Sequence, residues 1–306
     1  MSRSPRQAEA LLKRLEWTVV RRLDGILQGD YRTLFRGLGL DFADLREYQL
    51  HDDIRHIDWN VTARTQVTHV RVFNEDRDVT AWFLLDLSPS VDFGSGERGK
   101  REVLTEFVGV LARLFIHHGN KVGAILFDGA SEHVVPARAG RRHLLHMIDK
   151  IMSHPHRLRA PQTDLGAFLQ RSGGALKRRS VVFVVSDFIS RPGWERPLSA
   201  LSQRHETLAV RLFDPLELSL PDLGLLAFED AESGEQIFVD TTNHAFRQRF
   251  QSLAGQWEEA IVGAFAQAGV DALELSTAED LLDAILRFAG MRRAGAQAGA
   301  STGAVA

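Results

Sequence analysis

An apolar run from Val79 to Leu85 stops abruptly at Asp86, and this run limits the possible folds more than any other part of the sequence. A strand that is apolar throughout must be buried on both faces, as it is at the centre of a parallel sheet. Burying a carboxylate within such a strand would be costly. Asp86 is therefore expected at the carboxyl end of the strand, where open α/β sheets bind ligands.

Downstream of this run, buried strands alternate with amphipathic helices. The sequence predicts strands at residues 121–128, 133–137, 180–187, 207–213 and 271–275, with helices between them. This alternation predicts an α/β fold with a doubly wound, mostly parallel sheet and helices on both faces, assigned to a domain at residues 76–290. Within that domain, Leu225–Glu229 and Gln236–Asp240 flank a Ser-Gly turn and are predicted to form an inserted hairpin near residues 225–240.

The two ends of the chain differ from this central part. Apolar residues at three- and four-residue steps predict an amphipathic helix within residues 1–24. Residues 25–75 are rich in glycine and in both charge signs, which favours a small N-terminal subdomain, and residues 68–73 alternate like a strand. Ser276 and Glu279 predict a capping box for a final helix that ends at Gly290, and residues 291–306 are expected to be disordered.

Composition argues against several classes of protein. A formal net charge of -3 argues against a dedicated nucleic-acid binder. The absence of cysteine removes disulfides, thiolate metal sites and cysteine nucleophiles, and it fits a cytoplasmic location. The N-terminus holds no apolar core of signal-peptide length, and no apolar run is long enough for a direct membrane span, so a soluble protein is expected.

Hydroxyl groups follow Asp86 at every second position, as Ser88 and Ser90. Such a cluster of hard oxygens suits Mg²⁺ or Mn²⁺, although a turn whose Asp and Ser residues only cap backbone amides explains this stretch equally well. Thr163, just before a helix, and Asp187, at the end of a second buried strand, favour the ligand set. Strand ends of a parallel sheet lie along one rim, so all five residues can converge there.

The chemistry of these five residues points to binding rather than catalysis. Three neutral hydroxyl ligands backed by two carboxylates would leave much of the charge of a divalent cation uncompensated. Mg²⁺ keeps open positions for water or for an oxygen from elsewhere. A Glu or Asp side chain from a partner protein would complete such a site, so the sequence predicts metal-dependent docking onto a partner.

The motif DLSPS at residues 86–90, with Thr163 in QTDLGAF and Asp187 in VVSDF, resembles the metal-ion-dependent adhesion site of von Willebrand factor A domains. The resemblance implies that Ser88, Ser90 and Thr163 would contact Mg²⁺ (or Mn²⁺) directly. It also implies that Asp86 and Asp187 would act mainly through water or hydroxyl hydrogen bonds.

Together with this motif, the upstream segment REYQLHDDIRHIDWNVTAR resembles the bacterial family known as domain of unknown function 58, over approximately residues 30–240. Family members typically carry Gly immediately before the paired Asp residues, where this chain has His51, so a turn that needs positive φ would be reshaped here. The resemblance implies a partner, a MoxR-type AAA+ ATPase. The expected function is then that of a metal-dependent adaptor or co-chaperone-like protein and not of an enzyme.

Two enzymatic alternatives use the same part of the chain. Residues 94–101, GSGERGKR, match the spacing of a phosphate-binding loop through Lys100, but Arg101 replaces the required Ser or Thr and the glycines do not follow the strand directly, so nucleotide hydrolysis is rejected. A metal-dependent phosphohydrolase using Asp86 as nucleophile is the weaker alternative to docking. Such enzymes carry a second Asp two residues later as the general acid, where this chain has Ser88.

Overall fold

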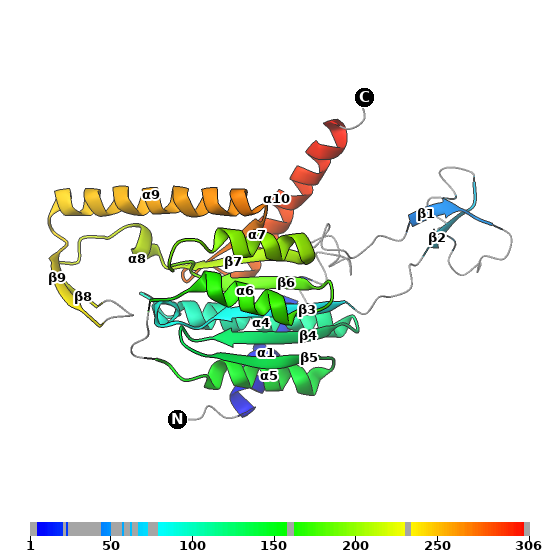
Figure 1. Ribbon diagram of the computed structural model, residues 1–306, viewed down its shortest axis with the longest axis horizontal. Coiled ribbons are helices and arrows are strands. Elements are labelled where there is room, and N and C mark those ends of the chain that lie inside the picture. The colour runs from blue at the N-terminus through cyan, green and yellow to red at the C-terminus, as the bar shows by residue number, and fades with distance from the viewer. Residues whose placement is uncertain are drawn as a thin grey trace.

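The computed structural model describes residues 5–20, 23, 44–49, 57, 62, 67–72, 79–157, 162–229 and 234–302. At its centre is a six-stranded sheet of order β10-β7-β6-β3-β4-β5 (Figure 1). Every strand pair in it is parallel except β4 with β5. The predicted doubly wound, mostly parallel α/β class is therefore confirmed, with strands β3 (Thr80–Asp86), β4 (Lys121–Phe127), β5 (Glu132–Arg138), β6 (Val181–Ser186), β7 (Glu206–Phe213) and β10 (Asp271–Ser276).

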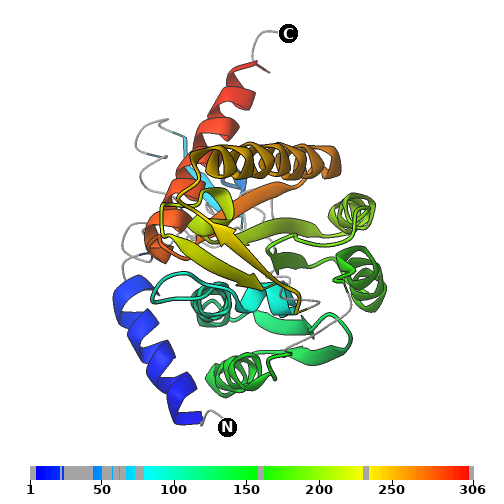
Figure 2. The ribbon, with the colours of Figure 1, turned by 90° about the vertical axis from the view of Figure 1, so that its left-hand side faces the viewer.

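Helices cover both faces of this sheet (Figure 2). One face carries α1 (Pro5–Leu15), α4 (Lys100–His117), α5 (Arg141–Ser153) and α10 (Leu281–Thr302), and the other carries α6 (Leu165–Ala175), α7 (Glu195–Arg204) and α9 (His244–Ala268). Successive side chains of a strand point to opposite faces. Phe83 and Leu85 accordingly belong to the first core and Leu84 to the second.

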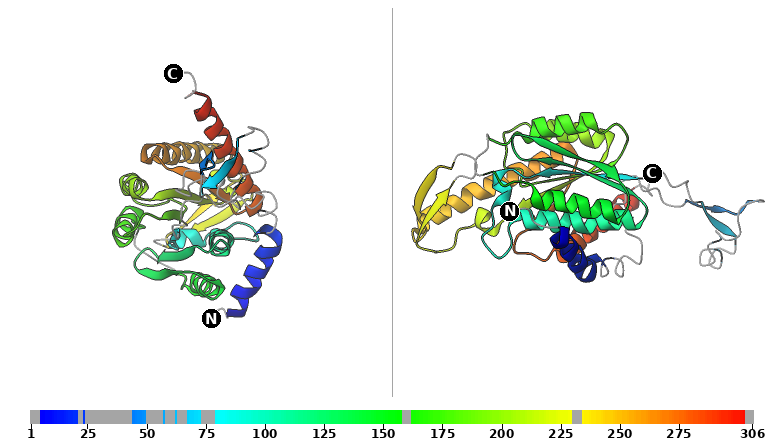
Figure 3. Two further views of the ribbon diagram at one scale, coloured as in Figure 1. Left: turned by 90° about the vertical axis from the view of Figure 1, so that its right-hand side faces the viewer. Right: turned by 90° about the horizontal axis from the view of Figure 1, so that it is seen from below.

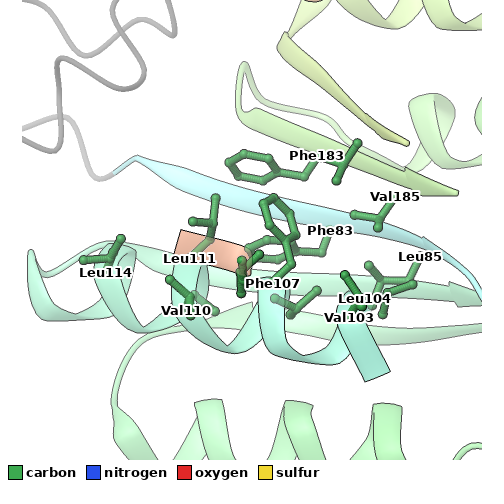
Figure 4. Packing of buried hydrophobic residues seen from close by; sticks show 14 of the residues in the cluster. Phe83, Leu85, Val103, Leu104, Phe107, Val110, Leu111, Leu114, Phe183 and Val185 are labelled. Carbon is green, nitrogen blue, oxygen red and sulfur yellow. The ribbon is translucent and has the colours of Figure 1, made fainter. Parts of the chain in front are cut away.

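Aromatic stacking fixes α4 against the two central strands. The rings of Phe83 on β3 and Phe183 on β6 stack with centroids 5.0 Å apart. Phe107 of α4 meets Phe183 edge-on at 6.1 Å (Figure 4). Phe115 of the same helix also meets Phe183 edge-on, at 5.9 Å. Offset and edge-to-face pairs of this kind stabilise beyond their area of burial. This packing holds the amino end of α4 close to the carboxyl ends of β3 and β6.

The amphipathic N-terminal helix is confirmed over α1, and the chain continues as a π-helical turn, η1 (Glu16–Val20). Ala8, Leu12 and Leu15 are buried where α1 packs on α4 and α5. The approach is close: a Cβ atom on Gly109 of α4 would lie 3.0 Å from the side chain of Leu15. The N-terminal helix is thus a part of the core on this face of the sheet.

The inserted hairpin is present as predicted, with β8 (Leu225–Glu229) antiparallel to β9 (Gln236–Asp240). It extends beyond the carboxyl end of the central sheet, next to the amino end of α9 (Figures 1 and 3). A short helix, α8 (Pro215–Leu218), leads from β7 towards the hairpin. The hairpin therefore lies at the same end of the molecule as the predicted metal site.

Two predictions about the C-terminal region are wrong. Helix α10 continues past Gly290 to Thr302, although disorder was predicted from residue 291. Each helical Gly costs only about 1 kcal/mol relative to Ala, and the Ala, Met, Arg and Gln residues around Gly290, Gly295 and Gly299 are good helix formers. Asp280, not Ser276, caps the helix: its Oδ1 accepts a hydrogen bond of 2.8 Å from Leu282 N, whereas Ser276 is the last residue of β10.

In the N-terminal part, the structure describes a small two-stranded sheet. Strand β1 (Asp44–Glu47) pairs antiparallel with β2 (His69–Val72), with Asp44 opposite Val72. This pair lies beyond the amino end of the central sheet, at the opposite end of the molecule from the β8–β9 hairpin (Figure 1). The strand predicted at residues 68–73 is confirmed. Most of the predicted subdomain at residues 25–75, including His51, lies outside the described residues.

Candidate metal site at the strand ends

The order of the strands switches between β3 and β6, and in open α/β sheets such a switch point forms a crevice at the strand ends. From β3 the chain adds β4 and β5 on one side, and after returning it adds β6, β7 and β10 on the other. Open α/β sheets bind ligands at such a switch point, outside the carboxyl ends of the strands. Asp86 ends β3 and Asp187 directly follows β6, so the two predicted carboxylates flank this crevice.

Asp86 is buried, and both of its carboxylate oxygens accept a hydrogen bond. Oδ1 accepts from Ser88 N at 3.0 Å, and Oδ2 accepts from the Ser186 hydroxyl at 2.7 Å. Burial raises the pKa of Asp86 from its ordinary value of 3.8 to about 6. The negative charge of Asp187 adds to that rise, while the hydrogen bonds from Ser186 and Ser88 oppose it. Burial and a neighbouring negative charge both disfavour the ionised form of a carboxylate, so both raise its pKa.

Ser88 and Ser90 lie side by side beyond Asp86. Ser90 belongs to a short 3₁₀ helix, η4 (Pro89–Asp92), and Ser88 immediately precedes that helix. Their Oγ atoms are 3.3 Å apart, and both residues are buried. Adjacent ligands of an octahedral Mg²⁺ ion, each about 2.1 Å from the metal, lie about 3 Å apart. The two hydroxyls can therefore both contact one such ion.

Asp187 is held by an unusual backbone turn. Its Oδ1 accepts a hydrogen bond of 3.0 Å from Ile189 N. Between them Phe188 has a φ of 59°, a conformation that is rare for a bulky residue and costs on the order of 1–3 kcal/mol. Phe188 is fully buried against Trp194 and Phe265, whose ring centroids lie 5.0 and 4.8 Å from its own. This aromatic packing stabilises the turn that positions Asp187.

Thr163 lies in the loop before α6 and is fully buried. Its carbonyl oxygen accepts a hydrogen bond of 3.0 Å from Arg191 N, in the loop that follows Asp187. This bond places Thr163 at the same end of the sheet as the other predicted residues. Hydrogen bonds and charge interactions bring Asp86, Ser88, Ser90 and Asp187 together, and Thr163 is connected to the loop after Asp187 by its hydrogen bond from Arg191 N.

A cation that the sequence did not predict at this site is Lys100, the first residue of α4. Its ammonium donates to Asp187 Oδ2 at 2.8 Å and to Glu217 Oε1 on α8 at 2.7 Å. Burial alone would lower the pKa of Lys100, but the charges of Asp187 and Glu217 outweigh it and raise that pKa above its ordinary value. The lysine of the glycine-rich motif GSGERGKR, which matches the spacing of a phosphate loop, is thus bound to two carboxylates.

A buried carboxylate that the sequence did not predict, Asp214, holds the loop between η4 and α4 in place. Asp214, which follows β7 and is buried, accepts hydrogen bonds from Ser95 N at 2.9 Å and Ser95 Oγ at 2.6 Å. It also accepts one from Thr277 Oγ1, at 2.7 Å, just beyond β10. Although burial opposes it, these bonds lower the pKa of Asp214 below its ordinary value. Asp214 thereby fixes the glycine-rich loop to the same sheet edge as the candidate site.

The residues present fit a weakly held divalent cation better than a tightly bound one. Within the described ranges, no group of three or more His, Asp or Glu side chains is arranged to hold a metal. The available oxygens are instead the paired hydroxyls of Ser88 and Ser90, with Asp86 and Asp187 already hydrogen-bonded behind them. Such a set suits Mg²⁺ or Mn²⁺ that keeps several water ligands.

The strand order, the single antiparallel edge strand and the hydroxyl-rich loop after β3 define a von Willebrand factor A-like α/β domain. The chain matches the family described as "Protein of unknown function DUF58" over residues 44–260. It is also 37% identical over 292 residues to "Uncharacterized protein Rv1480" of Mycobacterium tuberculosis, an alignment that covers 95% of this chain and 91% of the relative. The protein therefore belongs to the DUF58 family.

Solved structures similar to this one include BatB of Bacteroides thetaiotaomicron, described as a conserved hypothetical protein. The TM-score is 0.45 at 15% identity, covering 70% of this chain and 98% of BatB. The SpRpn10 VWA domain is similar with a TM-score of 0.40 at 14% identity, covering 68% of this chain and 93% of that domain. Across the described part of the chain, no helix combines the length and apolarity needed to cross a bilayer.

Proposed function

We propose that this protein is a protein-interaction module whose strand-end site binds Mg²⁺ (or Mn²⁺) and, through it, an acidic side chain of a partner. The observation that carries the proposal is the pair of hydroxyls of Ser88 and Ser90, 3.3 Å apart, beside the buried carboxylate of Asp86. Neutral hydroxyl ligands compensate little of the charge of a divalent ion, so the ion favours an additional anionic ligand. Nothing in this arrangement requires a chemical step.

In this proposal each residue of the chain has a distinct role. Ser88, Ser90 and Thr163 would supply the oxygens that hold the cation, which in turn supplies a positive charge for an incoming carboxylate. Asp86 orients the loop by accepting from Ser88 N, and Asp187 faces the same crevice from β6. The proposed partner is a MoxR-type AAA+ ATPase, as the family resemblance implies. The proposed location is the cytoplasm, where such a partner has access to ATP.

The proposal is tested with a variant carrying both Ser88→Ala and Ser90→Ala. Each change removes one hydroxyl and adds no bulk, so the fold is expected to remain intact by circular dichroism and thermal unfolding. Binding of Mn²⁺, measured by electron paramagnetic resonance, should fall at least about tenfold, a loss of about 1.4 kcal/mol. Mg²⁺-dependent binding to the purified MoxR-type ATPase from the same organism should fall with it.

A matched control carries Ser153→Ala and Ser252→Ala, which remove two exposed hydroxyls from α5 and α9. The control is expected to bind metal and partner as the wild-type chain does. Unchanged Mn²⁺ affinity in the Ser88 and Ser90 variant would refute the metal site. Loss of metal binding with unchanged partner binding would refute the docking mechanism but not the site.

The hydrolase alternative is separated from docking by a phosphate-ester assay. No observation in the described residues favours Asp86 as a nucleophile, because it is buried and each of its oxygens already accepts a hydrogen bond. Metal-dependent turnover of a generic phosphate ester that disappears in the Asp86→Ala variant would overturn the docking proposal in favour of this enzyme.

A further inference from the structure

Lys100 is a lysine whose side chain is only 1% exposed, at the end of the molecule where ligands are expected. Lysine is rarely buried unless it is paired, because removing its charge from water costs several kcal/mol. Here the pairing is double: Asp187 lies 2.8 Å and Glu217 2.7 Å from the ammonium. These two carboxylates come from different elements, the loop after β6 and helix α8, so Lys100 joins parts of the site that are far apart in sequence.

The position of this ammonium is fixed by the loop that precedes it. Lys100 N donates to Phe93 O at 2.9 Å, which closes residues 93–100 into a compact loop. The lysine Nζ lies 5.9 Å from the centre of the Phe93 ring, within the range of a cation–π interaction. Gly94 makes the loop possible, because a Cβ atom there would lie 2.5 Å from the backbone of Gly99. The ammonium is therefore held at the crevice and not free to turn away.

This position affects Asp187 directly. One oxygen of Asp187 accepts from Ile189 N and the other from Lys100 Nζ, so both are engaged by the protein. A cation at the hydroxyls of Ser88 and Ser90 would then meet Asp187 only through water. The ammonium also adds a positive charge beside Asp187, and like charges in a partly dehydrated site repel strongly.

We propose that Lys100 is a positioning residue that sets the divalent-cation affinity of the strand-end site, by holding Asp187 away from the ion and by repelling it. This inference rests on the proposed metal site. Its consequence is that the cation binds weakly on its own and binds tightly only when an acidic group of a partner completes the site. Glu217 has the opposite effect, because its negative charge offsets that of Lys100.

The test uses two variants of the full chain and Mn²⁺ alone as the probe. Lys100→Met keeps the length of the side chain and removes its charge, so Mn²⁺ affinity should rise at least about tenfold. Glu217→Gln removes a negative charge from a residue whose side chain is 24% exposed, so the fold should tolerate it. There, Mn²⁺ affinity should fall about three- to tenfold.

Neither Lys100 nor Glu217 would contact the ion. Opposite changes in Mn²⁺ affinity in Lys100→Met and Glu217→Gln are therefore a result that a purely structural role of these residues cannot produce. The matched control is Lys177→Met, which makes the same chemical change at an exposed residue before β6, at the other end of the sheet. Its Mn²⁺ affinity should equal that of the wild-type chain. Thermal unfolding of each variant confirms that it is folded.

The outcomes separate this inference from the metal site on which it rests. Binding of Mn²⁺ to the wild-type chain, with no tighter binding in Lys100→Met, would overturn the inference and leave the site intact. Mn²⁺ binding in Lys100→Met but not in the wild-type chain would overturn metal use by the native site and support the inference. No Mn²⁺ binding in either protein would overturn both the metal site and the inference. If Lys100→Met does not fold, weaker binding in Glu217→Gln supports the inference, and equal or tighter binding overturns it.

Discussion

Replacing Asp86 by Asn is expected to change how the stability of the protein depends on pH. Asn has nearly the same shape as Asp but carries no charge, and its carbonyl oxygen can still accept from Ser88 N. The side-chain amide would face the Ser186 hydroxyl, which also accepts from Phe188 N at 2.9 Å. The substitution therefore removes the buried charge and disturbs little of the surrounding hydrogen bonding.

The direction in which stability changes with pH follows from the raised pKa of Asp86. Folded protein holds the proton of Asp86 with a pKa of about 6, above the ordinary value of 3.8, so the folded state binds this proton more tightly than the unfolded chain does. The resulting stabilisation is complete below about pH 4 and is lost as the pH rises through about 6. The two pKa values differ by an amount equivalent to about 3 kcal/mol. Asp86→Asn has no such loss, so its stability relative to wild type should increase by about 2–3 kcal/mol between about pH 4 and pH 7.5.

The assay is urea unfolding of both proteins in EDTA at a series of pH values. Subtracting the two unfolding free energies at each pH removes the contributions of the titrating groups that do not interact with Asp86, and any constant cost of the substitution. A difference that stays the same from about pH 4 to pH 7.5 would refute the reasoning, because it would mean that Asp86 titrates normally. Adding Mg²⁺ at the higher pH should stabilise wild type more than Asp86→Asn, which lacks the negative charge.

Two further predictions concern the packing that supports the site. Phe183→Ala removes the ring that stacks on Phe83 and should cost about 3–5 kcal/mol in urea unfolding, whereas Phe238→Ala, at a residue that is 73% exposed on β9, should cost less than about 0.5 kcal/mol. Gly94→Ala places a methyl group against backbone and should cost at least about 1–3 kcal/mol in urea unfolding. Gly96→Ala, where nothing lies within 4 Å, is the control and should be close to neutral; equal effects of the two would contradict the loop geometry.

The bounds of the central strands could be predicted closely because their sequences are almost wholly apolar, as burial on both faces of a sheet requires. All six residues of β6 are buried, and the observed strand, Val181–Ser186, falls within the predicted range of 180–187. The same pattern predicted Asp86 at the end of β3, and parallel pairing brings the ends of β3 and β6 together without further information. The hydroxyl pair of Ser88 and Ser90 followed from local spacing alone.

The features that could not be predicted depend on contacts between distant residues. Lys100 is 87 residues from Asp187 and 117 from Glu217, and Ser95 is 119 residues from Asp214. No local pattern distinguishes a lysine that ends a phosphate loop from one that pairs with carboxylates, because both follow a glycine-rich turn. The pairing of Lys100 with Glu217 depends on the fold, which brings α4 and α8 to the same edge of the sheet.

The charged residues around the strand-end site relate metal-dependent docking to the proposed role of Lys100. Asp187 and Glu217 both pair with the ammonium of Lys100, so they compensate less of the charge of a divalent cation than two free carboxylates would. A cage made only of carboxylates would bind the cation tightly whether or not a partner were present. Here the hydroxyls of Ser88 and Ser90 add no charge, and Lys100 opposes the cation. Under the proposed function, docking would therefore require the cation and the partner's carboxylate together, and the removal of either would release the complex.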